Sequence, residues 1–343
     1  MKHGVYLHLP EEVYHAQKAV SKSLIKKAMI SPPDAHKALY GEFTVNSAMT
    51  YGSALHMLIL EGREKFDRKY CKGFDKKDFP TALDTVADLK QWLDGENVEY
   101  AKSAGKVSLV DTAINWDSTV SIIDVLKSEH EHDSIGKTQL PADDFDEIVS
   151  REEYRELLTG QYWSEVSFFW FDSELDCECK ARLDLVKFED GVCKILDLKS
   201  ITNRSQKWFP DACMSDITSF KYFIDAVFYV RAIKNTPRQF LSDIGEPATI
   251  PTQDEWPLEF STEFDLLFIE KCREDPNSQP ITMDLDLVGD CGATLDQVAT
   301  AIFKEKAEML NHYMNNYGEE KPWNVMGEKI EYNADNLPNW MAY

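Results

Sequence analysis

The sequence predicts a mixed α/β protein in which a central mixed β-sheet is flanked by helices. Apolar residues recur with helical spacing over the first sixty positions, and the pattern changes to strand-like alternation between residues 165 and 198. A helical pattern returns beyond residue 220. The order of helices, β-meander, helix and strand favours a sheet that is covered by helices.

Three helices are expected in the first sixty residues. The first spans 24–30, after Ser21-Lys22-Ser23 as its cap and before a Ser-Pro-Pro stop. The second starts near Asp34, and the third covers about 48–60 with an apolar stripe. Residues 72–135 are more polar, which indicates an insertion or subdomain within a single domain of 343 residues.

The middle of the chain predicts three antiparallel strands. Strand-like segments at 165–171, 177–188 and 192–198 are separated by turn residues at 172–174 and by Glu189-Asp190-Gly191. A helix is expected at 220–233, further strands at 263–270 and 280–286, and a long helix at 295–317.

Charge and composition limit the classes of function. The net charge of -23, taken alone, argues against nucleic-acid binding, because phosphates are neutralised by Lys and Arg. Residues 180–238, however, hold eleven basic and seven acidic residues, a local positive excess. No apolar run reaches the length of a membrane span, no secretion signal is visible, and the seven cysteines are scattered. We therefore expect a cytoplasmic protein with no membrane partner.

Two carboxylates and a lysine are expected to meet on neighbouring strands. Asp197 and Lys199 are two residues apart, so a strand points them to one face. A hairpin at 189–191 would bring Asp184 beside Asp197. Such a pair suits Mg²⁺, which needs only one or two carboxylates besides water and phosphate, and metal-assisted phosphodiester hydrolysis is the matching chemistry. A solvated surface strand is the alternative interpretation.

These residues also resemble a known family. Asp184 followed by Asp197-Leu198-Lys199 is similar to the D…(D/E)-x-K signature of PD-(D/E)XK nucleases, in its RecB-like and RecE-like form. The segment from Tyr51 to His56 resembles the helical G-x-x-x-H motif of that group. The first residues, Trp323 and the Leu-Pro-Asn-Trp sequence at 337–340 are also similar to RecE-like nucleases.

The resemblance implies a PD-(D/E)XK nuclease core with specific roles for these residues. His56, Asp184 and Asp197 would bind Mg²⁺, with Mn²⁺ as a substitute, and Lys199 would be the catalytic lysine. Glu165 matches a family glutamate near the metal, but a surface glutamate at a strand edge fits as well. For His56 the alternative is a buried, hydrogen-bonded side chain.

The resemblance further implies a substrate-binding set, namely Ser21, Ser23, Arg182, Asp225 and Tyr229. Ser21, Ser23 and Arg182 would hold a terminal phosphate, although Ser21 or Ser23 equally suits a helix N-cap. Tyr229 fits the family pattern, whereas Asp225 stands where the family usually has glutamine. Asp225 could therefore add a metal ligand, pair with Lys199 or repel phosphate.

The expected function is a metal-dependent exodeoxyribonuclease of linear duplex DNA, with 5′→3′ polarity and 3′ single-stranded tails as product. The resemblance also implies a homo-oligomeric ring and a single-strand annealing partner of the RecT-like kind. Residues 86–110 resemble a SAP-type DNA-binding module, or equally a plain two-helix insert. The alternatives are a PD-(D/E)XK endonuclease, and a catalytically weakened DNA-end binder or acidic DNA mimic. A nuclease with a four-cysteine iron–sulfur cluster does not fit the cysteine spacing.

Overall fold

A computed structural model describes residues 1–7, 9–41, 46–133, 136–140, 162–204, 206–241, 260–271, 277–289 and 292–324. The predicted tail motif at 337–340, Cys272 and Cys291 lie outside the described residues. No helix in the described part of the chain is long and apolar enough to cross a membrane.

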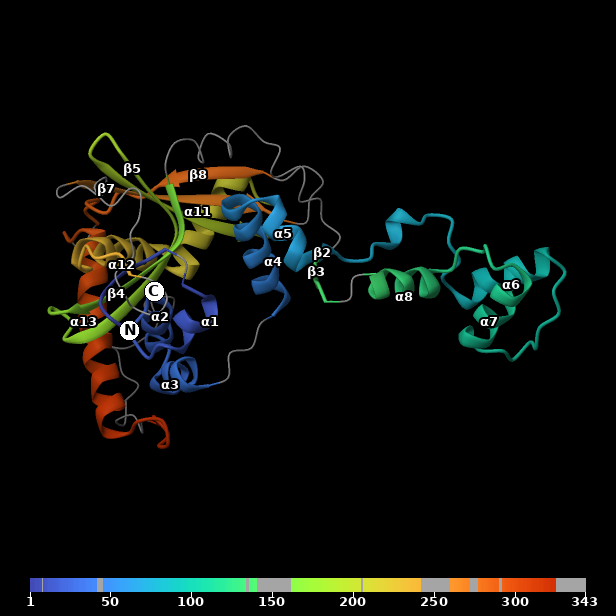
Figure 1. Ribbon diagram of the computed structural model, residues 1–343, viewed down its shortest axis with the longest axis horizontal. Coiled ribbons are helices and arrows are strands. Elements are labelled where there is room, and N and C mark those ends of the chain that lie inside the picture. The colour runs from blue at the N-terminus through green and yellow to red at the C-terminus, as the bar shows by residue number, and fades with distance from the viewer. Residues whose placement is uncertain are drawn as a thin grey trace, which may run out of the picture.

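The described residues form a six-stranded mixed sheet, which confirms the predicted mixed α/β class; the PD-(D/E)XK core stays a prediction. Its strands, in spatial order, are β1 (Gly4–Tyr6), β4 (Tyr162–Asp172), β5 (Cys177–Glu189), β6 (Val192–Ile201), β7 (Ser261–Glu270) and β8 (Ser278–Thr282). Only β6 and β7 pair in parallel, and the other neighbours in this sheet are antiparallel. The predicted meander is therefore present as β4, β5 and β6. Figure 1 shows the sheet within the larger body of the molecule, with helices against it.

A two-residue turn joins β5 to β6. Asp190 and Gly191 have φ angles of 51° and 78°, and the flanking residues Glu189 and Val192 pair with each other. Two successive positive φ angles are the requirement of a type I′ hairpin, and Asp-Gly is one of its preferred sequences. This local sequence thus fixes the register that brings Asp184 toward Asp197.

Helices cover the sheet and enclose the main core. The N-terminal ones are α1 (Glu11–Ala16), α2 (Lys22–Ala28), α3 (Pro32–Tyr40), α4 (Ser47–His56), a π-helical turn (Met57–Glu61) and α5 (Arg63–Lys69); the later ones are α11 (Phe209–Phe220), α12 (Tyr222–Asn235) and α13 (Leu295–Asn316). α12 packs on β4, β5 and β7 and against α13, which contacts α2 and α3. The π-helical turn continues α4, and its Leu58 packs with Leu196 and Leu198 of β6 in a second core.

Several elements differ from the sequence prediction. Strand β1, helices α1 and α5, the short strands at 70–72 and 138–140 and the helix at 123–133 were not predicted. The helix α11 was missed, because its start at Trp208-Phe209-Pro210 carries no capping side chain and half of its residues are polar or small. The last strand was predicted at 280–286, but β8 begins at Ser278 and ends at Thr282, where pairing with Asp265 of β7 stops. The other predicted helices and strands are present, with boundaries shifted by a few residues.

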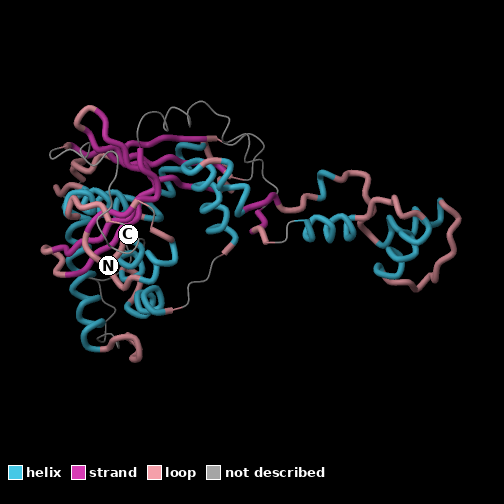
Figure 2. Tube along the Cα trace, in the orientation of Figure 1, coloured by secondary structure: helices cyan, strands magenta, loops and turns pink. Residues whose placement is uncertain are grey.

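The segment 72–133 forms an arm that projects from the body (Figures 1 and 2). It holds a short 3₁₀ turn (Lys76–Asp78), α6 (Val86–Gly95), α7 (Lys106–Trp116) and α8 (Ile123–Asp133), and it leaves the body through the parallel pair β2 (Tyr70–Lys72) and β3 (Thr138–Leu140). The arm has a small core of its own, made by Leu89, Leu93, Leu109, Ala113 and Ile122. A role of its residues 86–110 in DNA binding stays a prediction.

Candidate metal centre

The site begins where β5 and β6 stop pairing. Leu185 and Leu196 form the last cross-strand pair in this direction, so the next residues, Asp184 and Asp197, leave the ladder. Asp184 then replaces the missing partner, because its Oδ2 accepts a hydrogen bond of 2.8 Å from the backbone N–H of Leu198. The carboxylate is thereby fixed at the point where the two strands separate.

His56, at the end of α4, contacts the backbone of the same residue, Leu198. Its Nε2 lies 3.2 Å from the carbonyl oxygen of Leu198, which can only accept a hydrogen bond. Nε2 therefore carries a proton, and Nδ1 is the nitrogen that faces the carboxylates. Nδ1 lies 3.6 Å from Asp184 Oδ2 and 3.8 Å from Glu165 Oε1. A histidine whose second nitrogen donates to a backbone carbonyl is a typical arrangement of metal ligands.

Glu165 is brought to the site by an unusual backbone conformation. Its φ is +53°, within the left-handed region, although it lies inside strand β4. The register sets it opposite Asp184, between the pairs Ser164–Leu185 and Val166–Leu183. The alternation of side chains also breaks here: Leu183 and Val186 of β5 both belong to the main core, although they are three residues apart. Strain of this kind is stored preferentially at functional sites.

Glu165 is further held by Arg182. The guanidinium Nε donates a 2.8 Å hydrogen bond to Glu165 Oε2, and its Nη1 donates to the carbonyl oxygen of Leu9 at 2.9 Å. Arg182 lies two residues before Asp184 on β5, so both side chains leave the strand on one face. Arg182 therefore orients a carboxylate of the site, and its contact with a terminal phosphate stays a prediction.

One group of described residues could hold a metal ion. It consists of His56, Glu165 and Asp184, and one ligand atom from each of them lies within 4.8 Å of those of the other two. Burial works against a charged imidazole, but Asp184 and Glu165 outweigh it and raise the pKa of His56 to about 9. Burial raises the pKa of Asp184 to about 6, with the carboxylates of Asp197 and Glu165 adding to the effect and His56 opposing it. The site therefore has a strong preference for positive charge.

A second cluster adjoins this set. Asp197 is 1 % exposed and its Oδ2 lies 2.5 Å from Lys199 Nζ, while its Oδ1 lies 3.7 Å from Lys22 Nζ. Burial alone would raise the pKa of Asp197, but the two lysines outweigh it and hold that pKa well below its usual range. Asp225 of α12 contacts Lys22, Lys199 and also Lys26 of α2.

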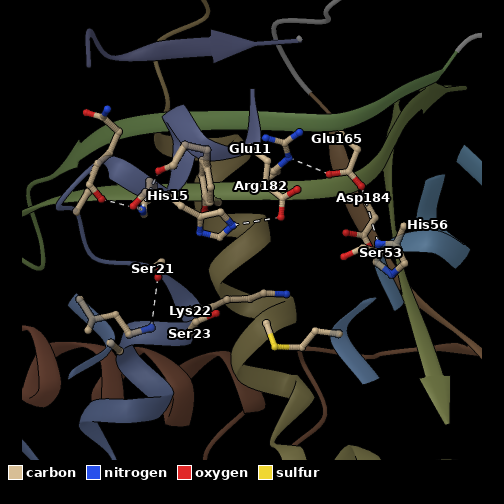
Figure 3. Close-up of a pocket in the computed structure, with 18 of the residues that line it drawn as sticks. Glu11, His15, Ser21, Lys22, Ser23, Ser53, His56, Glu165, Arg182 and Asp184 are labelled. Atoms are coloured by element: carbon tan, nitrogen blue, oxygen red, sulfur yellow. Dashed lines mark hydrogen bonds and ion pairs between the residues drawn. The ribbon is translucent and has the colours of Figure 1, made fainter. Parts of the chain in front are cut away.

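Both clusters meet a cleft of about 740 Å³. In Figure 3, His56, Glu165 and Asp184 lie together at one side of this cleft, and Ser21, Lys22 and Ser23 of α2 lie across from them. Tyr229 also lines the cleft, and Lys22 Nζ lies above its ring, 4.2 Å from the ring centre. Asp197, Lys199 and Asp225 are not among its lining residues and connect with it through Lys22.

The predicted site residues thus separate into two groups. The structure places His56 and Asp184 with Glu165, and it places Asp197 with Lys199 and Asp225. Ser21 is the N-cap of α2, since its Oγ accepts a 3.3 Å hydrogen bond from the N–H of Leu24, and it lines the cleft as well.

Sequence reasoning missed Lys22 and Lys26. Part of the signal was present, because Lys26 lies on a predicted helix and Lys22 lies four residues earlier, in its predicted cap, so that one more helical turn would put both on one face. What it could not show is that this face turns toward β6 and α12.

The donor set of the first group suits a divalent cation. Two carboxylates and a neutral imidazole nitrogen are ligands that such ions accept in proteins, and a cation between them would relieve the repulsion that the buried carboxylates impose on each other. Comparison with known proteins finds no family model that matches the chain and no curated protein that resembles it. The argument about function therefore depends on the site itself.

Proposed function

We propose that the protein is a divalent-metal-dependent nuclease with a PD-(D/E)XK core, and that it degrades one strand of linear duplex DNA from its end. The observation that carries the proposal is the convergence of His56 Nδ1, Glu165 and Asp184 on one point beside the lysines of the second cluster. Acidic metal ligands next to buried lysines match phosphodiester hydrolysis, in which an anionic phosphate must approach an anionic site.

His56, Glu165 and Asp184 would hold the ion, and Asp197 remains a predicted fourth ligand. When bound, Mg²⁺ or Mn²⁺ activates water and stabilises the charge that develops on phosphate. The protein contributes the orientation of these groups: Leu198 fixes the imidazole and one carboxylate, and Arg182 fixes the other. Fixed groups of this kind lose little free energy to reorganisation during the reaction.

The lysines contribute positive charge where the substrate phosphate would lie. Lys22 lines the cleft, and Lys199 shares both of its carboxylate partners. Burial works to lower the pKa of each lysine, but the carboxylates outweigh it, so both stay protonated across the physiological range. Lys199 is accordingly proposed to supply positive charge rather than to act as a base.

The remaining features of the proposal concern the substrate. An end-dependent, 5′→3′ reaction would leave a 3′ single-stranded tail for a RecT-like annealing partner, and a homo-oligomeric ring would let an acidic exterior coexist with a basic channel. The overall charge of -23 is consistent with such a separation of charge. DNA binding by that channel should weaken steeply as salt increases.

The test compares linear and covalently closed duplex DNA, with Mg²⁺, with Mn²⁺ and with EDTA. We expect loss of linear DNA alone, in the presence of metal alone, and no activity in Asp184→Asn. The control Asp296→Asn makes the same change at an exposed position on α13 and should retain full activity. Cleavage of closed circles would replace the exonuclease with an endonuclease. Binding of DNA ends without any cleavage would replace it with a DNA-end binder.

A further inference from the structure

Asp225 lies at the centre of the second cluster. It is only 2 % exposed, on the buried side of α12, yet three ammonium groups surround its carboxylate. Lys22 and Lys26 approach from α2, and Lys199 approaches from β6. A single buried carboxylate thus connects three elements of the fold at the edge of the candidate metal centre.

The contacts form a closed ring of alternating charge. Lys22 Nζ lies 3.7 Å from Asp197 Oδ1 and 3.4 Å from Asp225 Oδ2. Lys199 Nζ lies 2.5 Å from Asp197 Oδ2 and 3.7 Å from Asp225 Oδ2. Each of these lysines therefore bridges the same two carboxylates, and Lys26 is attached to Asp225 outside the ring.

This ring determines where the lysine charges lie. If Asp197 were the only carboxylate, the ammonium groups of Lys22 and Lys199 would both move closer to it and would repel each other there. Asp225 draws each of them partly away from Asp197. The two ammonium groups are then held apart, with Lys22 at the cleft and Lys199 behind it.

We propose that Asp225 is a positioning residue that holds Lys199 and Lys22 in the geometry needed for turnover, at the expense of substrate affinity. This inference rests on the proposed nuclease function. The carboxylate lowers the net charge that the cluster offers to a phosphate, so it weakens DNA binding. It also fixes the lysines, so its removal slows the chemical step.

The expected result in Asp225→Asn is a fall in both kinetic constants, kcat and KM. Turnover should fall by about tenfold or more, while KM for DNA, or Kd measured with Ca²⁺, should fall about threefold or more. A residue that only stabilised the fold would not lower KM and kcat together. The control Asp211→Asn removes the same charge from an exposed position on α11 and should change neither constant.

A double variant separates position from charge. Asp225→Asn combined with Lys26→Met restores the charge balance of the cluster, because one lysine and one carboxylate are removed together. We expect DNA affinity to return to its original value while turnover stays low. Recovery of turnover in the double variant would overturn the positioning role, as would unchanged kinetics in Asp225→Asn. Asp225→Glu, which keeps the charge, should recover part of the turnover.

One measurement keeps this inference separate from the proposed function. If the unmodified protein does not cleave DNA under any metal condition, the proposed function fails by itself. The pairing is then tested by acetylation with acetic anhydride, followed by mass spectrometry of Lys199 and Lys22. Both lysines should react faster in Asp225→Asn than in the unmodified protein, at equal thermal stability. Equal reaction rates would overturn the inference.

Discussion

Glu165 provides a test of whether the fold holds a residue of the site in a backbone conformation that this residue does not favour. Its φ of +53° places a residue with a side chain in the left-handed region, inside a strand. That conformation costs roughly 1–2 kcal/mol for a residue other than glycine. We compare Glu165→Ala with Glu165→Gly, because both remove the carboxylate and its contacts with His56 and Arg182. The difference between the two variants therefore isolates the backbone.

Glycine relieves the strain, but it costs roughly 0.5–1 kcal/mol through the greater freedom of the unfolded chain. The Gly variant should therefore be more stable than the Ala variant by about 0.8 kcal/mol, the difference between the central values, and by at most about 1.5 kcal/mol. Urea unfolding measures this difference as a higher midpoint at equal m value. If the Ala variant is as stable as the Gly variant, the backbone at position 165 is not strained, and the argument for a conformation selected by function fails.

Three further predictions concern stability. Asp172 is 1 % exposed and accepts hydrogen bonds of 2.5 and 2.6 Å from Arg231. Arg231→Met should therefore lower the free energy of unfolding by about 3–5 kcal/mol. A loss below about 1 kcal/mol, measured by urea unfolding, would contradict this prediction. Burial acts to raise the pKa of Asp172, but Arg231 and Trp170 outweigh it and lower that pKa to about 2. Because the folded-state pKa is depressed, this stabilisation is complete above the unfolded value near 3.8 and is lost as the pH falls toward 2. The urea midpoint should decline more steeply in that window for the unmodified protein than for Arg231→Met, and parallel curves would exclude the ion pair as the cause. Leu93→Ala in the core of the arm should increase hydrogen exchange in α6 and α7, while β4 to β6 stay protected from exchange. An equal loss of protection in these helices and in these strands would mean that the arm and the body unfold together.

The sequence was sufficient to predict the strands that carry the site. Alternation over 165–198 and the Asp-Gly turn at 190–191 gave the meander and its register, because these signals are local. The proximity of Asp184 and Asp197 followed from that register. The helix α11 carries no comparable local signal, since no capping side chain marks its start.

Other parts of the site depend on contacts between distant segments. Lys22 reaches Asp197 across 175 positions of the chain, and His56 Nε2 is oriented by the carbonyl oxygen of Leu198. Neither contact leaves a periodic pattern in one stretch of sequence. The positive φ of Glu165 is equally hidden, since glutamate is not a residue that favours that conformation. Sequence reasoning therefore identified most of the residues, but not their grouping or their protonation.

The claim that His56, Glu165 and Asp184 form a metal site is tested most directly by calorimetric titration of the protein with Mn²⁺. We predict one tight site in the unmodified protein. His56→Gln, Glu165→Gln and Asp184→Asn should each weaken it by more than ~10-fold, since even the outer partners of metal ligands contribute that much. The exposed variant Asp296→Asn should bind as before. Affinity that is unchanged in all three site variants, or the absence of any binding to the unmodified protein, would contradict the account.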